Sequence, residues 1–234
     1  MRITQRIPAR VKWIGGGIGL AATAYLARAG WTWLRFGMIA PAAPADAEPL
    51  LDAFMPDYDV VERHHLRVDA PAEVALAAAL DTSVQQTLLA KTIFAARALA
   101  LGGQRDDTER PRGLLPLMQS IGWEVLAQVP GREIVFGAVT APWDAEPVFR
   151  PVGKGYFAGF NERGFVKIVW TLRADPADAG TCVFRTETRA VATDPFARAR
   201  FRRYWAFVEP GVRLIRRALI DQVKREAERR ACAA

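Results

Sequence analysis

The most constraining feature of this sequence is an apolar stripe near its C-terminus. Its members follow one another at spacings of three or four residues, as on one face of an α-helix: Phe201, Trp205, Val208, Val212, Ile215, Leu219 and Val223. Asp194 and Pro195 predict the cap and the first residue of this helix. Pro210 lies inside the pattern and predicts a kink. A helix of this length must bury its stripe against a second layer.

Alternating apolar and polar residues upstream predict that this second layer is an antiparallel sheet. The expected strands are 58–68, 122–129, 132–139, 165–173 and 181–191, with a further short strand within 142–150. Two helices, 72–80 and 84–101, and a polar loop, 102–112, are expected after the first strand. The order predicts an α+β domain in which a bent antiparallel sheet wraps around the long C-terminal helix. Such a sheet leaves a pocket between the two layers.

A basic leader and an uncharged segment open the chain. Residues 1–12 carry four basic residues and no acid, and residues 13–27 carry no charge. We expect a transmembrane or signal-anchor helix over 13–37, with the excess of basic residues favouring a cytoplasmic N-terminus. Arg28 and Arg35 follow the uncharged stretch 13–27, so the side of the membrane on which the domain folds stays open. A cleaved signal peptide and a buried or interfacial helix are the alternatives.

The charge distribution bears on the partners. Residues 1–40 and 194–234 each carry a net charge of +6, whereas residues 41–193 carry −5. Basic flanks beside an apolar segment suit an anionic lipid surface, while a nucleic-acid-binding protein needs a basic folded body. Abundant alanine and an excess of arginine over lysine favour a bacterial source. We therefore expect a single-pass protein of the bacterial inner membrane and no nucleic-acid partner.

Prolines and alanines set the domain boundary. They dominate residues 38–52, which predicts an extended Pro/Ala linker. The folded domain is expected to span residues 53–230.

No motif predicts a metal or a cofactor. Cys182 and Cys232 have no metal-ligand spacing, and the adjacent His64 and His65 point to opposite faces of a strand. Residues 17–22 match the glycine pattern of dinucleotide-binding proteins, but no βαβ unit surrounds them. We therefore expect neither a metal ion nor a nucleotide cofactor.

Two residues on the first strand could perform chemistry. Glu62 and His64 share the strand face that also carries Leu66 and Val68, which is expected to point inward. A carboxylate beside an imidazole in an apolar pocket can act as an acid–base couple. The alternative is a hydrogen-bonded pair with a structural role.

Ligand-contacting residues are expected on the same inward surface. They are Trp170, Phe184, Thr186, Thr188 and Trp205. Cross-strand pairing of the threonines and core packing of the aromatic side chains are the alternatives. The opposite face of the last strand carries only charged residues at these positions: Arg185, Glu187 and Arg189. We expect this row of charges to be exposed to solvent. The arginines of the C-terminal helix predict a solvated face.

The chain resembles the START-like superfamily, also called the polyketide cyclase/dehydrase, helix-grip or SRPBCC superfamily. The matching segments are 58–65, 68–74, 184–189, 193–194 and 201–205, within a resemblance that covers about residues 58–229 and points to a bacterial subgroup. The resemblance implies a hydrophobic ligand cavity. It implies no particular activity, because the superfamily includes lipid carriers, hormone receptors and cyclases.

Three functions are therefore open. The first is a membrane-tethered domain that binds a hydrophobic or lipid-like small molecule in an internal cavity. The second is an enzyme of the cyclase/dehydrase type that uses Glu62 and His64. The third is a structural or interaction protein whose own side chains fill its core.

Overall fold

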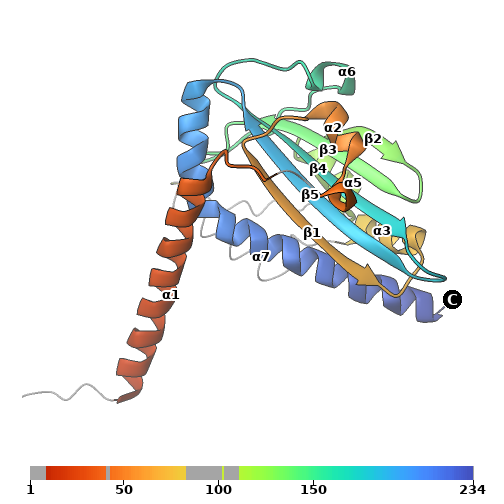
Figure 1. Ribbon diagram of the computed structural model, residues 1–234, viewed down its shortest axis with the longest axis horizontal. Helices are drawn as coiled ribbons and strands as arrows, with labels where there is room; N and C mark the ends of the chain where they lie inside the picture. The colour runs from red at the N-terminus through yellow and green to blue at the C-terminus, as the bar shows by residue number, and fades with distance from the viewer. Residues whose placement is uncertain (1–8, 41–42, 83–101, 103–110, 234) are drawn as a thin grey trace, which may run out of the picture.

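The long elements form where the local signals of the sequence are strongest (Figure 1). The structure, a computed structural model, describes residues 9–40, 43–82, 102 and 111–233. In chain order the elements are α1 (Ala9–Arg35), the short 3-10 helix η1 (Pro44–Asp46), α2 (Pro49–Phe54), β1 (Val60–Val68), α3 (Ala72–Asp81), α5 (Leu114–Ser120), β2 (Glu124–Val129), β3 (Glu133–Thr140), α6 (Lys154–Phe157), β4 (Val166–Pro176), β5 (Cys182–Ala192) and α7 (Pro195–Ala233). The expected helix 84–101 and most of the expected loop 102–112 lie outside the described residues.

The five strands form one antiparallel sheet in the order β1-β5-β4-β3-β2. β2 and β3 form the expected hairpin, and Gly131 takes the positive φ of 69° in its turn. The expected short strand within 142–150 is wrong, since Arg150 makes only an isolated bridge to Val139. Pro142 and Pro147 lack the backbone N–H that a strand would need there.

The main core lies between the sheet and α7. Residues that alternate along the strands point to α7, and we call this side of the sheet its inner face. The buried residues of this core include Ile134, Phe136, Leu172 and Phe184 from the strands and Leu219 and Val223 from α7. An antiparallel sheet with a long C-terminal helix along one face is the helix-grip arrangement, so the expected α+β fold is confirmed.

α7 begins and bends where the sequence predicts. The Asp194 carboxylate accepts hydrogen bonds from the backbone N–H groups of Phe196 and Ala197, at 2.9 and 3.1 Å. The helix continues through Pro210, which cannot donate a backbone hydrogen bond to the preceding turn. Figure 1 shows the resulting kink: the first part of α7 runs beside α1, and the rest runs along the sheet.

A second apolar core covers the outer face of the sheet. Leu51 of α2 and Met55 are buried with Val135, Val169 and Phe157. Every residue of β3 is therefore buried, because both faces of this strand are covered. The segment expected to be a linker thus also contributes part of the layer over the outer face.

The expected row of exposed charges on the outer face is wrong, because the layer that contains α2 covers it. Glu187 and Arg189 are only 3% and 2% exposed. Arg63 Nε donates to Glu187 Oε2 at 2.7 Å, and Arg189 Nη1 donates to Asp52 Oδ1 at 2.6 Å. The alternation of polar and apolar residues identifies the face of a strand, but it does not tell whether another segment packs over that face.

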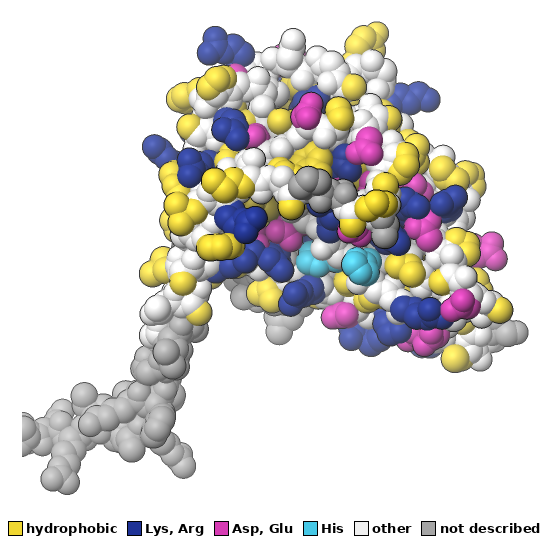
Figure 2. Space-filling view, viewed as in Figure 1, with side chains coloured by type: hydrophobic (Ala, Val, Ile, Leu, Met, Phe, Trp, Pro, Cys, Tyr) yellow, Lys and Arg dark blue, Asp and Glu magenta, His cyan; other side chains and the backbone are white. Residues whose placement is uncertain are grey.

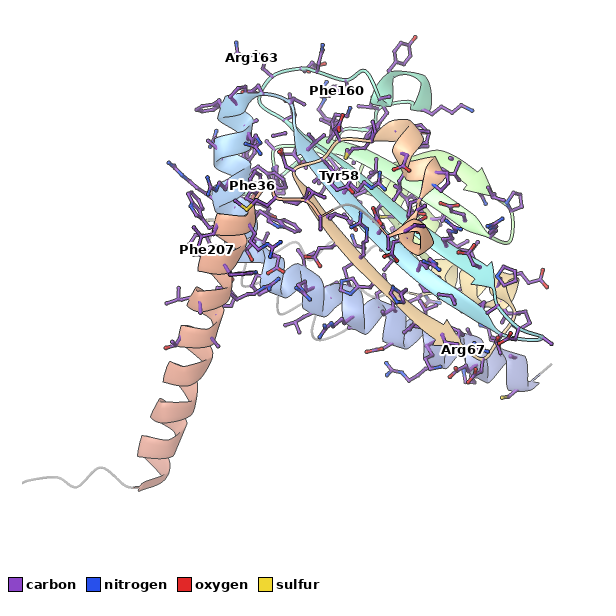
Figure 3. The ribbon with its side chains drawn as sticks, viewed as in Figure 1. Phe36, Tyr58, Arg67, Phe160, Arg163 and Phe207 are labelled. Carbon is purple, nitrogen blue, oxygen red and sulfur yellow. The ribbon has the colours of Figure 1, made fainter. Side chains whose placement is uncertain are left out.

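α1 packs against the first part of α7. Glu209, almost fully buried on α7, accepts hydrogen bonds from Arg28 Nε at 2.9 Å and Thr32 Oγ1 at 3.2 Å. Burial raises the pKa of Glu209, but the hydrogen bonds from Arg28 and Thr32 and the charges of Arg28 and Arg213 together outweigh it, so the net shift is downward. At the same junction the rings of Phe36 and Phe201 lie 5.6 Å apart, and Figure 3 labels Phe36 there.

The expected membrane span is not found. Among the residues that the structure describes, no helix combines the length and the apolar character that crossing a bilayer requires. The assignment as a single-pass protein of the bacterial inner membrane is therefore wrong. Arg28, which lies just after the uncharged segment, pairs with Glu209.

Exposed apolar side chains gather on α1 and on the first part of α7 (Figure 2). They are Tyr25, Leu26, Trp31, Trp33, Leu34, Met38, Phe196 and Phe207. Arginines lie over three of these rings, with Arg35 Cζ 5.3 Å from the Trp31 centroid, Arg202 Cζ 4.5 Å from the Trp33 centroid and Arg200 Cζ 5.6 Å from the Phe196 centroid. Cation–π contacts of this kind partly cover the exposed rings.

Candidate functional site

The inner face carries a group of polar side chains that we call the polar patch. Its members are Glu62 and His64 of β1, Thr186 and Thr188 of β5, Trp170 of β4, and Arg213 and Arg216 of α7. The register of the sheet assembles the strand residues: Glu62 lies opposite Thr188, His64 lies opposite Thr186, and Trp170 lies opposite Thr188 on the other side. Residues directly opposite on one face of a sheet have neighbouring side chains.

Trp170 stands at the centre of the polar patch. Its Nε1 donates a hydrogen bond of 2.7 Å to Thr186 Oγ1. Its ring lies 5.5 Å from that of Phe136 and 6.4 Å from that of Trp123, the second pair edge to face. The Arg216 guanidinium carbon lies 4.2 Å from the Trp170 ring centroid. The Trp170 side chain therefore contacts the aromatic core, the Thr186 hydroxyl group and the Arg216 guanidinium.

Glu62 and His64 are brought together as expected for neighbours on one strand face. His64 Nε2 lies 3.5 Å from Glu62 Oε2, and their side chains are only 9% and 12% exposed. Arg213 Nε lies 3.9 Å from Glu62 Oε2, and Arg213 Nη1 donates to Glu209 Oε1 at 3.4 Å. The Glu62 carboxylate is therefore held between an imidazole and a guanidinium.

Two buried polar atoms of the polar patch have no hydrogen-bond partner in the described part of the chain. They are His64 Nε2 and Thr188 Oγ1. Leaving a buried polar atom unpaired costs about 1–3 kcal/mol, and the large majority of buried side-chain polar atoms in proteins are paired. Within the described part of the chain, both atoms are therefore available to a further polar group.

Arg216 faces the same region from α7. It follows Val212 by four residues and precedes Leu219 by three, so it lies on the stripe that faces the sheet. Burial lowers its pKa to about 10, while the nearby Glu62 acts in the opposite direction. The guanidinium thus stays positively charged at neutral pH. The side chain nonetheless keeps part of its accessible surface.

The other expected ligand-contacting residues have different surroundings. Phe184 is fully buried in the main core. Trp205 lies in a separate apolar cluster with Phe201 and Tyr204, its ring 5.9 Å from that of Phe201. The structure thus groups Trp170, Thr186 and Thr188 with Glu62 and His64, and it places Trp205 nearer the start of the long helix.

Arg213 and Arg216 were not foreseen as site residues, because arginines on an amphipathic helix are most often solvated. A local signal was present for one of them. Arg216 shares helical spacing with Val212 and Leu219, both members of the apolar stripe. An arginine at a position within such a stripe is expected to face the core of the domain and not the solvent.

A groove elsewhere fits a ligand less well. It has a volume of about 370 Å³ and lies between α3 and the C-terminal part of α7. The charged residues along it are largely paired: Arg230 with Glu226 and Asp81, and Arg229 with Glu226. Its three arginines and two carboxylates leave a net charge of +1, and Ala78 is the one apolar residue among its lining side chains, so the groove offers an apolar molecule little surface to bind.

The described residues hold no group of three or more side chains of the types that bind metal ions. Cys182, buried, and Cys232, exposed, are both free thiols.

Comparisons with known proteins identify no family. No family model matches the chain, and no curated protein matches it. Among solved structures it is similar to a point mutant of norcoclaurine synthase from Thalictrum flavum in complex with a transition-state analogue, with 14% identity over 72% of this chain and 93% of that chain and a TM-score of 0.34. It is also similar to a protein from Chromobacterium violaceum, with 16% identity over 69% and 98% and a TM-score of 0.25. An aromatase/cyclase from a Streptomyces species has 15% identity over 73% and 94% and a TM-score of 0.24. At these values the likeness carries no argument about function, and the fold assignment rests on the topology described above.

Proposed function

We propose that the protein binds an apolar or lipid-like small molecule between the inner face of the sheet and α7. The observation that carries this proposal is that two buried atoms, His64 Nε2 and Thr188 Oγ1, form no hydrogen bond with any of the described residues. A bound molecule that offers a polar atom to this pair would remove the cost of leaving them unsatisfied.

The surroundings of the polar patch suit the apolar part of such a molecule. Trp170, Phe136 and Trp123 pack around it, and Ile168 and Ile215 lie at the edge of the same core with part of their surface still accessible. Ligand sites are commonly apolar and contain a few polar groups that fix the orientation of the ligand.

Ligand binding is tested on the full chain by native mass spectrometry and by titration with phenylnaphthylamine, an uncharged dye that fluoresces in apolar sites. We expect one bound molecule per chain and saturable fluorescence. The bulky variant Ala138→Trp, on the inner face, should abolish both signals. The exposed variant Ala53→Trp is the matched control and should bind like the unmodified protein. Absence of both signals from the folded, unmodified chain would rule out the proposal.

An acid–base enzyme is the second candidate, because the Glu62 carboxylate and the His64 imidazole lie 3.5 Å apart in a largely buried setting. We expect the dehydration of a β-hydroxy ketone, followed by ultraviolet absorbance of the enone, to slow by roughly a hundredfold or more in Glu62→Gln and His64→Gln. His65→Gln, on the exposed side of the same strand, serves as the control. Equal rates in all four proteins would exclude this activity.

A further inference from the structure

We infer that the small molecule bound at the polar patch is an amphipathic anion whose single negatively charged group pairs with Arg216. The inference rests on the proposed binding function and specifies the chemical class of the ligand. A carboxylate, sulfonate or phosphate on an apolar body would meet its requirements.

The position of Arg216 is the first argument. Its guanidinium lies over the Trp170 ring, with 4.2 Å between its Cζ atom and the ring centroid. A cation–π contact holds the charge above the ring and does not use the acceptors that the five N–H donors need. The contact therefore keeps this cation at the polar patch while its donors stay available to an anion.

The second argument is that Arg216 lacks an acceptor. In the described part of the chain, no residue forms a hydrogen bond or an ion pair with this guanidinium, although it carries five N–H donors. Two other arginines of α7 differ. Arg213 contacts Glu209 and Glu62, and Arg230 contacts Glu226 and Asp81. Arg216 is therefore the cation whose donors a ligand can satisfy.

The third argument comes from the unpaired atoms around it. Thr188 lies opposite Trp170 in the sheet, so its hydroxyl lies beside the ring that Arg216 covers. His64 lies opposite Thr186, the hydrogen-bond partner of Trp170. Thr188 Oγ1 and His64 Nε2 can both donate a hydrogen bond, and an anion accepts from guanidinium, hydroxyl and imidazole alike.

The local charge balance is the fourth argument. Arg28 neutralises Glu209, and Arg213 lies close to Glu62. After these pairs are formed, the polar patch keeps one positive charge, that of Arg216. A single anionic group complements it, whereas a cationic ligand would meet repulsion.

Two dyes that share a carbon skeleton separate the charge from the apolar body. Anilinonaphthalene sulfonate carries a sulfonate, and phenylnaphthylamine is its uncharged counterpart. We expect the full chain to bind the sulfonate dye more tightly. Arg216→Met should weaken binding of the sulfonate dye roughly tenfold to a hundredfold and change binding of the uncharged dye by less than about twofold.

Arg217→Met is the matched control, since Arg217 is the neighbouring arginine of the same helix and is exposed. It should leave both affinities unchanged, which excludes a contribution from sulfonate bound at the helix surface. Arg216→Lys keeps the charge but loses the planar donor pair, so an intermediate affinity for the sulfonate dye is expected. This variant also provides the comparison if Arg216→Met does not fold.

The outcomes distinguish the two proposals. If both dyes bind but the Arg216 variants change both affinities equally, or neither, the assignment of an anionic ligand is wrong and the proposed binding function stands. If neither dye binds the folded chain, the binding function fails and the anionic ligand fails with it.

Discussion

At the scale of the residue, Thr186 and Thr188 differ although they belong to the same strand face. Thr186 Oγ1 accepts the Trp170 Nε1 hydrogen bond at 2.7 Å, whereas Thr188 Oγ1 is buried without a partner among the described residues. The first hydroxyl stabilises the core, and the second imposes a cost on the unliganded protein.

The two valine substitutions should therefore have opposite effects. Thr186→Val leaves the Trp170 N–H unpaired and should lower the free energy of unfolding by about 1–3 kcal/mol. Thr188→Val keeps the shape and removes an unsatisfied hydroxyl, so it should leave stability unchanged or raise it while weakening the binding of anilinonaphthalene sulfonate. Urea unfolding and dye titration of the same samples measure both quantities. Equal destabilisation by the two substitutions would contradict the different roles assigned to them.

The sequence predicts part of this residue-level arrangement. Strand alternation places Glu62 and His64 on one face of the first strand. It likewise places Thr186 and Thr188 on one face of the last strand, and each of these two assignments needs only the local sequence. Their assembly into one patch depends on the pairing of β1 with β5, across more than a hundred residues of chain. No local pattern contains that register, so the neighbours of each residue could not be derived.

At the scale of the element, the pair of α1 and α7 depends on one buried carboxylate. Glu209 is almost inaccessible to solvent, and Arg28 of α1 supplies its strongest contact. Removing Arg28 would leave the buried Glu209 carboxylate with weaker contacts, to Arg213 at 3.4 Å and Thr32 at 3.2 Å, and breaking a buried ion pair in this way is destabilising.

We expect Arg28→Met to lower the free energy of unfolding by about 3 kcal/mol. Replacing both partners, Arg28→Met with Glu209→Met, should recover much of that loss, because no charge is then left buried. Arg35→Met, on the exposed side of the same helix, is the control and should change stability by less than about 0.5 kcal/mol. Urea unfolding of the four proteins decides the question, and a double variant as unstable as the single one would argue against a role for the ion pair.

A second element-scale prediction concerns Glu48, which precedes α2 over the outer face. Burial raises the pKa of Glu48 to about 7, and the attraction of Arg173, whose Nη1 lies 3.1 Å from Glu48 Oε2, offsets this only in part. A carboxyl group with a raised pKa in the folded state binds its proton more tightly there than in the unfolded chain. Its contribution to stability therefore falls as the pH rises from about 4.5 to about 7.

Glu48→Gln removes this titration. Relative to the unmodified protein, the variant should be more stable at pH 8 than at pH 5 by up to about 3 kcal/mol. The measurement is the difference in free energy of unfolding between the two proteins at each pH. A difference that does not change with pH would show that the Glu48 carboxyl is not perturbed.

The elements themselves were predictable to different degrees for physical reasons. α7 was foreseen because its stripe, cap and proline are all local signals. The hairpin of β2 and β3 was foreseen because Gly131 has few alternatives in a tight turn. α2 was not, since its six residues are too few for a helical repeat and it forms by packing on the sheet.

At the scale of the whole molecule, the sheet is enclosed on both sides. α7 and α3 cover the inner face, while the layer with α2 and α6 covers the outer face. Tyr58, labelled in Figure 3, lies between β1 and this outer layer, with Arg189 Cζ 4.7 Å from its ring centroid. A sequence rich in proline and alanine suggested an extended connector over 38–52, but the packing of Leu51 shows that composition alone does not reveal such a layer.

The bend at Pro210 gives the two halves of α7 different neighbours, and Arg213, one turn beyond it, contacts both sides. Its guanidinium reaches Glu209, which α1 holds, and Glu62, which belongs to the polar patch. A single side chain therefore contacts both the carboxylate that holds α1 and the carboxylate of the proposed ligand site. A ligand that moves the Glu62 side chain would therefore change the contact of Arg213 with Glu209 and, through it, the stability of the packing between α1 and α7. Amide hydrogen exchange measured along α1 would detect this change although α1 does not contact the ligand.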